Sequence, residues 1–289
     1  QFDEVVLIRE TGGSVGHGRN DLASGPDWTV HSIHGDSIRV PDDATLETPT
    51  EDPDSRPLGH WLTLGRDDRH WHLHARGLRN PYGLDFNHHG EAFTYDADNE
   101  GDLGLPFYRP SRINHLVRGA NYGWWQRPGN TRSLPVYAPD SLPTTFDVGR
   151  GSPTSVKFGY RSRFPTPWRE ALFALDWAYG RILSVHLTPR GASYYASGSE
   201  FLTGRPLNVT DLDFDSNGDL YFITGGRKTK SALFRIRYEG DPSPRNRPST
   251  QAALRESFSL GRRDIRKRLV DNESTITPAS ECWPHLSSR

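Results

Sequence analysis

A histidine and an aspartate lie 19 residues apart near the start of this 289-residue chain. His17 stands just before a predicted pair of strands, and Asp36 follows the second strand of that pair. A hairpin of this length brings the start of one strand beside the end of the next, so the two side chains can be neighbours. A carboxylate on one imidazole nitrogen fixes the tautomer and makes the other nitrogen a better base. Because the chain has 12 histidines, spacing alone leaves a catalytic dyad open.

A second polar pair, Arg79 and Asn80, precedes another predicted strand at the position equivalent to His17. An arginine there could direct its charged fork at developing negative charge. Alternatively, the pair only caps the start of the strand. The sequence leaves both interpretations open.

Four carboxylates fall within the segment 96–102, after the second strand of the same repeat. Asp96, Asp98 and the adjacent Asn99 offer oxygen ligands in a short loop, which suits Ca²⁺. The alternative is that Arg109 and Arg112 neutralise the loop. We expect a calcium site here, although it is not an EF-hand.

A basic loop with two glycines covers residues 225–231 and includes Arg227. It does not match the phosphate-binding P-loop pattern. It could present cations to an anionic ligand, which makes Arg227 a candidate for cofactor binding, or it could only close a hairpin.

The elements that must position these groups recur about every 63 residues. A strand, a tight turn and a second strand begin near Leu22, Leu84 and Leu212, which are 62 and 128 residues apart, and a skipped repeat is expected near 150–190. Such a period predicts a β-propeller with about four blades in this chain. A β-sandwich with evenly spaced hairpins is the alternative. Glycine supplies the positive φ of the turn in two repeats, so Trp28, at the same position, is expected to force a different turn.

Composition favours the same all-β class. Hydrophobic residues make up 34%, and 28 glycines and 22 prolines indicate many turns. A net charge of −1 argues against a nucleic-acid partner, and no apolar run is long enough to span a membrane. The single cysteine, Cys282, excludes an internal disulfide and a Cys-x-x-Cys site within the chain.

We divide the chain into a partial propeller at 1–240, a linker at 241–248 and the start of a C-terminal helical region at 249–289. Apolar residues at helical spacing predict a helix over 249–270. Since the chain contains no methionine and runs at once into apolar residues, we interpret it as a piece of a longer protein.

Taken together, these segments resemble the glucose/sorbosone dehydrogenase family, whose soluble quinoproteins carry pyrroloquinoline quinone (PQQ) in a six-bladed β-propeller. The runs 77–84 and 119–124 are similar to that family's signature. The chain looks closest to the propeller of secreted, planctomycete-type haem-binding proteins, which are membrane-bound dehydrogenase-like. In those proteins a helical region and a haem domain follow.

This resemblance implies a role for each matching residue. His17 would be the base that takes the substrate proton, with Asp36 orienting it. Arg79 would lie over the quinone oxygens, with Asn80 beside it. The calcium site would involve Asp96, Asp98 and Asn99. The enzymes carry an arginine pair for the cofactor carboxylates where this chain has Asn208 and Thr210.

The expected function is therefore oxidation of a sugar or alcohol hydroxyl with a PQQ-like cofactor and calcium. Electrons would pass to a haem domain of the same parent chain, in a periplasmic or secreted bacterial protein. Two alternatives stay open. One is a catalytically silent carbohydrate-binding propeller whose contact surface is formed by Tyr108, Tyr122, Trp124 and Trp125. The other is a calcium-dependent lactonase.

Overall fold

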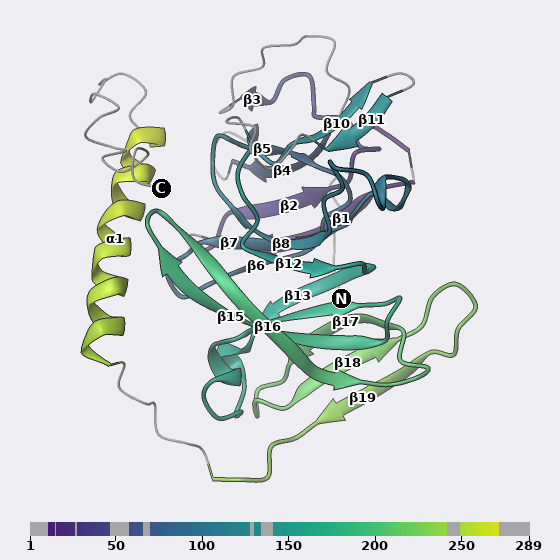
Figure 1. Cartoon of the computed structure of the whole chain (residues 1–289), viewed down its shortest axis with the longest axis vertical. Helices are drawn as coiled ribbons and strands as arrows, with labels where there is room; N and C mark the ends of the chain where they lie inside the picture. The colour runs from purple at the N-terminus through teal and green to yellow at the C-terminus, as the bar shows by residue number, and fades with distance from the viewer. Residues whose placement is uncertain are drawn as a thin grey trace, which may run out of the picture.

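The computed structural model describes residues 11–14, 16–26, 28–46, 58–65, 70–127, 130–133, 141–241 and 249–271. Most of this part of the chain is built from antiparallel sheets, and a long helix lies at one side (Figure 1). The first sheet has the order β1 (Arg19–Ser24), β2 (Val30–His34), β4 (Gly59–Leu64), β5 (Trp71–Leu78) and β3 (Thr45–Leu46), and β9 (Ala120–Asn121) also pairs with β5.

Three further sheets follow along the chain. The second has the order β12 (Phe146–Gly149), β8 (Ser111–Leu116), β7 (Ala92–Asp96) and β6 (Tyr82–Phe86). The third contains β13 (Pro153–Phe158), β14 (Leu172–Asp176), β15 (Arg181–Arg190) and β16 (Ser193–Thr203). The fourth contains β17 (Val209–Phe214), β18 (Leu220–Thr224) and β19 (Ala232–Ile236). A small separate sheet pairs β10 (Trp124–Arg127) with β11 (Asn130–Ser133), and short 3₁₀ turns occur at Glu100–Asp102 (η1), Gly159–Arg161 (η2) and Trp168–Glu170 (η3).

Successive sheets pack face to face as propeller blades do. The first strands lie side by side, with β1 against β6, β6 against β13 and β13 against β17. A buried apolar cluster fills each of the three gaps between neighbouring sheets. A carboxylate accepts a hydrogen bond across each of these gaps. Asp21 accepts the amide of Leu84 at 2.8 Å, Asp85 accepts the amide of Phe158 at 2.7 Å, and Asp211 accepts the hydroxyl of Ser155 at 2.8 Å. This arrangement confirms the all-β propeller prediction and excludes a two-sheet sandwich.

The turn at Trp28 differs from its prediction. Trp28 adopts a φ of 65°, close to the 72° of Gly90 at the equivalent position. The turn hydrogen bonds are also the same, because the amide of Trp28 donates to Gly25 at 3.0 Å and that of Gly90 donates to Asn87 at 2.9 Å. The expectation of a different turn is therefore wrong. Hydrogen bonding and strand pairing hold a non-glycine residue in the left-handed region, at a cost in strain.

The skipped repeat falls where it was expected, at residues 150–190, but its strands are assigned differently. The hairpin visible in the sequence joins β14 and β15, the second and third strands of the third sheet. The first strand of that sheet is β13, and the connection from β13 to β14 contains η2 and η3 instead of a tight turn. Because this connection is long, the first two strands of the third sheet do not form a recognisable hairpin in the sequence.

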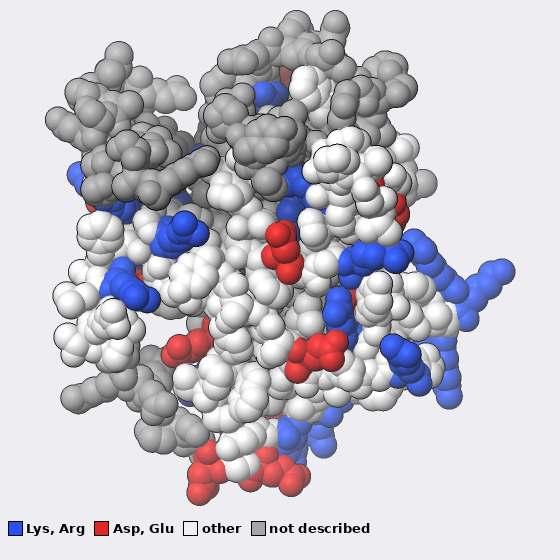
Figure 2. Space-filling view, in the orientation of Figure 1, with Lys and Arg blue, Asp and Glu red and all other residues white. Residues whose placement is uncertain are grey.

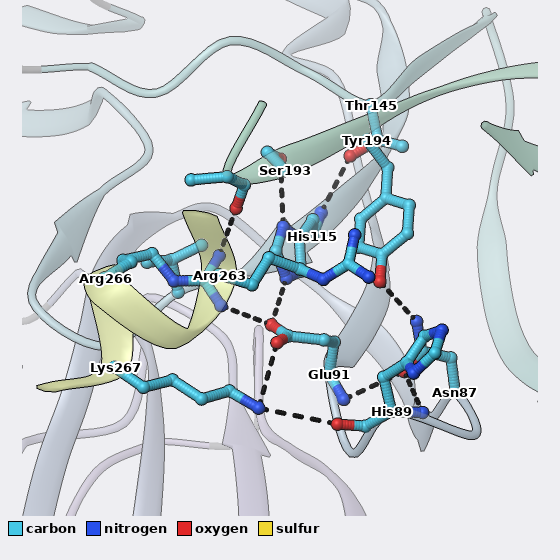
Figure 3. A network of polar contacts seen from close by, with 12 residues as sticks. Asn87, His89, Glu91, His115, Thr145, Ser193, Tyr194, Arg263, Arg266 and Lys267 are labelled. Carbon is cyan, nitrogen blue, oxygen red and sulfur yellow. Dashed lines mark hydrogen bonds and ion pairs between the residues drawn. The ribbon is translucent and has the colours of Figure 1, made fainter. Parts of the chain in front are cut away.

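The predicted helix is present as α1 (Thr250–Asp271), whereas most of the predicted linker lies outside the described residues. Three basic side chains of α1 point toward the second and third sheets (Figure 3). Arg266 pairs with Glu91, Lys267 lies 3.0 Å from the same carboxylate, and Arg263 lies over the ring of Tyr194. No helix in the described part of the chain is both long and apolar enough to cross a membrane.

Candidate active site

The side chains of His17 and Asp36 are in contact, as their spacing predicted. Nδ1 of His17 lies 2.6 Å from Oδ1 of Asp36. The Asp36 side chain is buried, whereas 30% of the His17 side chain is exposed. Because a carboxylate only accepts, the Nδ1 proton belongs to this hydrogen bond, and in the neutral imidazole Nε2 carries the lone pair. An imidazole in this tautomer can accept a proton from a ligand.

The backbone around Gly35 brings the two groups together. A Cβ atom at Gly35 would lie only 2.6 Å from Cβ of His17. The amide of Ser37 donates to the carbonyl oxygen of His17 at 3.1 Å, and the amide of His17 donates to Oγ of Ser37 at 3.0 Å. The residue at position 35 must therefore lack a side chain for His17 to rest against the end of β2.

In the next two sheets an aspartate ends the second strand, two residues before the position that corresponds to Asp36, and it has a structural role. Asp96, at the end of β7, accepts the amides of Arg79 and Asn80 at 3.1 and 2.9 Å. Asp176, at the end of β14, accepts the amide of Ser152 at 2.9 Å. Both carboxylates anchor the backbone that leads into the first strand of their own sheet. In the first sheet β2 ends at His34, and Asp36, two residues further on, holds the imidazole side chain of His17.

Arg79 lies directly beside the dyad. Its carbonyl oxygen accepts the amide of Asp36 at 2.9 Å. Its guanidinium donates through Nη1 to the carbonyl oxygen of Asp98 at 2.6 Å, and Nη2 lies 3.3 Å from the carboxylate of Glu100. The backbone thus fixes Arg79 next to Asp36, while the acidic loop holds its guanidinium.

Asn80 links the first two repeats. The side-chain amide of Asn20 donates to Oδ1 of Asn80 at 2.9 Å and to the carbonyl oxygen of Pro81 at 2.6 Å. Asn20 belongs to β1, directly after the segment that carries His17. The predicted pair Arg79–Asn80 and the predicted dyad therefore form one continuous group.

Trp124 contacts both halves of this group. Its indole N–H donates to Oδ2 of Asp36 at 2.7 Å. The guanidinium carbon of Arg79 lies 5.4 Å from the centre of the indole ring, which is a cation–π contact. The Trp124 side chain is buried, so both contacts are shielded from water.

Donor groups surround Asp96 and Asp98 of the acidic loop. Besides the two amides, Oδ2 of Asp96 accepts from Arg112 at 3.1 Å. Burial raises the pKa of Asp96, and Arg112 opposes this shift. Asp98 accepts the hydroxyl of Tyr108 at 2.6 Å, and Asn99 immediately precedes η1. Arg112 therefore neutralises Asp96, in line with part of the alternative to calcium, whereas Arg109 donates to Tyr122 and Ser141 instead of to the loop.

These contacts do not favour a metal site in the loop. A guanidinium and N–H donors, which compete with a cation, already occupy the oxygens of Asp96. Among the described residues, no group of three or more His, Cys, Asp or Glu side chains could hold a metal ion. The calcium site at Asp96, Asp98 and Asn99 stays a prediction.

Arg227 lies on the fourth sheet, in the loop between β18 and β19. Its guanidinium is 5.4 Å from the ring centre of Trp177, whose indole N–H donates to the carbonyl oxygen of Gly225 at 2.7 Å. Figure 2 shows Lys and Arg side chains projecting along the edge where this loop lies in Figure 1. The loop presents cations, but the contacts of Arg227 are separate from those of the His17 group.

Two neutral side chains lie where the family resemblance predicts the arginine pair for the cofactor carboxylates. The amide of Asn208 donates to the carbonyl oxygen of Trp177 at 3.0 Å. The hydroxyl of Thr210 donates to the carbonyl oxygen of Ile223 at 3.2 Å. Both groups satisfy backbone oxygens and offer no charge to a cofactor carboxylate.

Two residues assigned to a carbohydrate contact surface are buried instead. Tyr122 and Trp124 are 1% and 3% exposed. The hydroxyl of Tyr122 donates to the carbonyl oxygen of His115 at 2.5 Å. The aromatic surface of the silent-propeller alternative is therefore wrong at these two positions. The sequence did not reveal that Trp124 joins the dyad to Arg79, although the Asn-Tyr-Gly-Trp run marked it for attention.

The comparisons with known proteins agree on the fold. No family model and no curated protein matches the chain. A glucose dehydrogenase-type oxidoreductase from Thermus thermophilus superposes with a TM-score of 0.54 and 19% identity, covering 75% of this chain and 65% of that one. The PQQ-bound aldose sugar dehydrogenase from Streptomyces coelicolor gives 0.52 and 16%, covering 75% of this chain and 61% of that one.

A third solved structure, the holo form of the pyranose dehydrogenase PQQ domain from Coprinopsis cinerea, gives a TM-score of 0.51 at 14% identity. It covers 75% of this chain and 69% of the fungal domain. This chain spans less than two thirds of the length of the Thermus and Streptomyces enzymes. At these identities the likeness concerns architecture. The chain has the β-propeller fold of the soluble PQQ-dependent glucose and aldose sugar dehydrogenases.

Proposed function

We propose that the chain is the propeller part of an oxidoreductase that oxidises a sugar or alcohol hydroxyl with a quinone cofactor of the PQQ type. The observation that carries the proposal is the His17–Asp36 contact beside Arg79. A base and a cation at one place suit the removal of a hydroxyl proton together with the stabilisation of negative charge. The shared fold with PQQ-bound sugar dehydrogenases supports this reading.

His17 accepts the hydroxyl proton at Nε2 and becomes an imidazolium. Asp36 stabilises that charge through the Nδ1 hydrogen bond of 2.6 Å. Arg79 would supply a fixed positive charge beside the quinone oxygens, where negative charge would develop. When bound, a quinone would supply the acceptor for the hydride that leaves the carbon bearing the hydroxyl, so the substrate loses one proton and one hydride, which are two electrons and two hydrogens in total.

The described residues offer better partners for the quinone oxygens of the cofactor than for its carboxylates. Arg79 and Asn80 would hold the quinone oxygens, and Arg227 could meet one carboxylate. Asn208 and Thr210 are neutral and engaged with backbone oxygens. A tricarboxylate gains much of its affinity from charged donors. We therefore expect weaker PQQ binding than an arginine pair at these positions would give.

Further parts of the proposal rest on the family resemblance. They are calcium beside the cofactor at Asp96, Asp98 and Asn99, electron transfer to a haem domain of the parent protein, and a periplasmic or secreted location. No step above is assigned to calcium.

The test uses the full-length natural protein, because this chain spans only part of the length of related propellers. The protein is loaded with PQQ, and oxidation of aldoses and alcohols is followed by reduction of a dye. His17→Ala is expected to lower turnover by about 100-fold or more, the usual contribution of a general base. The matched control is His88→Ala, at an exposed turn residue of the second sheet. Equal turnover in His17→Ala and the parent would refute the proposal.

A further inference from the structure

We propose that Trp124 is a positioning residue that sets the orientation of Asp36, and through it the tautomer of His17, while it also supports Arg79. This inference rests on the proposed function, which makes His17 the base. Trp124 itself would not touch the substrate. It would act through Asp36 on His17, and through its contact with Arg79.

The two oxygens of the Asp36 carboxylate have different partners. Oδ1 faces Nδ1 of His17 at 2.6 Å, and Oδ2 accepts the indole N–H of Trp124 at 2.7 Å. A hydrogen bond to a buried carboxylate is charge-assisted and strongly directional. With one oxygen held by the indole, the carboxylate plane is fixed, and the other oxygen stays directed at Nδ1.

The same side chain supports Arg79. Its ring lies under the guanidinium, with 5.4 Å between the ring centre and Cζ. The guanidinium is also bound by the carbonyl oxygen of Asp98 at 2.6 Å, so it is held on two sides. Trp124 therefore sets the spacing between the His17–Asp36 dyad and the guanidinium of Arg79. In addition, the amide of Asp36 donates to the carbonyl oxygen of Arg79.

The chain holds Trp124 by a close approach of two backbones. The short strand β9 pairs in parallel with β5 at Ala75 and Arg76. Just beyond this pairing, a Cβ at Gly77 would lie 2.1 Å from Oδ1 of Asn121. That oxygen accepts the amide of Gly123 at 2.9 Å. The turn leading into Trp124 is thus fastened to the segment leading into Arg79.

Arg109 closes this turn from the other side. Nη1 of Arg109 donates to the carbonyl oxygen of Tyr122 at 2.8 Å and to Oγ of Ser141 at 3.0 Å. Gly123 has a φ of 82°, and a Cβ there would lie 2.8 Å from Nη1 of Arg109. Burial lowers the pKa of Arg109 to about 10, with Arg112 adding to the shift, so the guanidinium keeps its charge at neutral pH. The approach to Trp124 is therefore rigid on both sides.

The proposal predicts a specific defect when only the indole N–H is removed. In Trp124→Phe an aromatic ring under Arg79 remains, but Oδ2 of Asp36 loses the hydrogen bond from the indole N–H. The carboxylate can then rotate away from Nδ1, and the His17 ring can populate the other tautomer. Nitrogen-15 NMR of histidine-labelled protein reports the tautomer of His17 directly, without cofactor or substrate.

We expect a new Nε2–H tautomer signal for His17 in Trp124→Phe and a kcat about tenfold lower, the size of one charge-assisted hydrogen bond. KM should change little. The matched control is Trp168→Phe, because Trp168 lies in η3, in the connection from β13 to β14, and is 39% exposed. The control should keep the parent's tautomer and its kcat. A His17 spectrum in Trp124→Phe identical to that of the parent would overturn the proposal.

A second variant guards against misfolding. Site-specific replacement of Trp124 by benzothienylalanine keeps the bicyclic ring and exchanges the N–H for sulfur. It should show the same tautomer signal, and its absence in a folded protein would also overturn the inference. Since the NMR measurement needs no turnover, the two proposals separate. A tautomer change in a protein that oxidises no sugar or alcohol would support the positioning role and refute the proposed function.

Discussion

Asp36 holds an imidazole from a position two residues beyond β2, whereas Asp96 holds two backbone amides from the last position of β7. Each carboxylate binds the segment that leads into the first strand of its own sheet. In the first sheet this segment places His17 within reach of Asp36, so the carboxylate there binds a side chain. The candidate site thus lies where the end of a second strand meets the entry to a first strand, as the contact of Asp96 does in the second sheet.

The two aspartates should respond differently to the same substitution. Asp96→Asn leaves the buried Arg112 without its counter-charge, and breaking such a pair costs about 3 kcal/mol in free energy of unfolding. Asp36→Asn keeps an oxygen that can accept from Trp124, so it should cost about 1 kcal/mol. Urea unfolding of the two variants measures the difference. Equal losses would show that the two carboxylates have equivalent structural roles.

Trp28 offers a substitution that should stabilise the protein. Its φ of 65° is strained for a residue with a side chain, and the side chain is 78% exposed, so little packing would be lost. Trp28→Gly should raise the free energy of unfolding by about 0.5–1 kcal/mol, after the entropy cost of glycine is included. Thermal unfolding should show a higher midpoint.

Gly90 provides the reciprocal control for Trp28. It has a φ of 72° at the equivalent turn, so Gly90→Ala introduces the strain that Trp28 already bears. We expect a loss of about 1–2 kcal/mol. If Trp28→Gly were destabilising while Gly90→Ala behaved as expected, the indole would have a packing role outweighing its backbone strain.

Local patterns predicted most of the fold and part of the site. The turns, the propeller period and the neighbourhood of His17 and Asp36 all follow from strand and turn lengths, which are local properties. The contacts of Trp124 depend on how the small sheet of β10 and β11 lies against Asp36 and Arg79, and spacing along the chain does not encode that. The turn at Trp28 was mispredicted because the turn hydrogen bonds and the pairing of β1 with β2 overrode the conformational preference of one residue.

Three buried histidines should make the protein sensitive to acid. Burial lowers the pKa of His34 to about 3, that of His60 to about 4 and that of His115 to about 4. The unfolded chain takes up these protons near pH 6.5, whereas the folded chain does so only at about 3 to 4. The unfolded state therefore binds more protons in that window, and stability falls as the pH drops from 6.5 toward 4.

Each of these histidines can contribute up to about 1.4 kcal/mol per pH unit to that slope. Urea unfolding at a series of pH values measures it. The ring of His60 is stacked on that of His34. Because His60→Gln removes one titrating imidazole, the slope should flatten by about one proton. A slope between pH 6.5 and 4 that is the same in the variant and the parent would mean that His60 is charged in the folded state.

The docking of α1 should depend on Glu91. Burial alone would raise the pKa of Glu91, but the hydrogen bond from His115 and the charges of Arg266 and Lys267 lower it well below its usual range. Glu91 is therefore ionised, and it joins the second sheet to the helix (Figure 3). Glu91→Gln removes the charge that holds two cations of α1, and loss of one member of a buried pair is strongly destabilising.

We expect α1 to detach in Glu91→Gln while the sheets stay folded, because few other side chains are buried in the described part of the helix, and Leu254 and Phe258 are exposed. Hydrogen exchange should then accelerate at 250–271 and remain slow in β7 and β8. The matched control is Asp264→Asn, which breaks the exposed pair with Arg268 and should leave exchange unchanged. Slow exchange of α1 in Glu91→Gln would show that apolar packing, and not this carboxylate, holds the helix against the propeller.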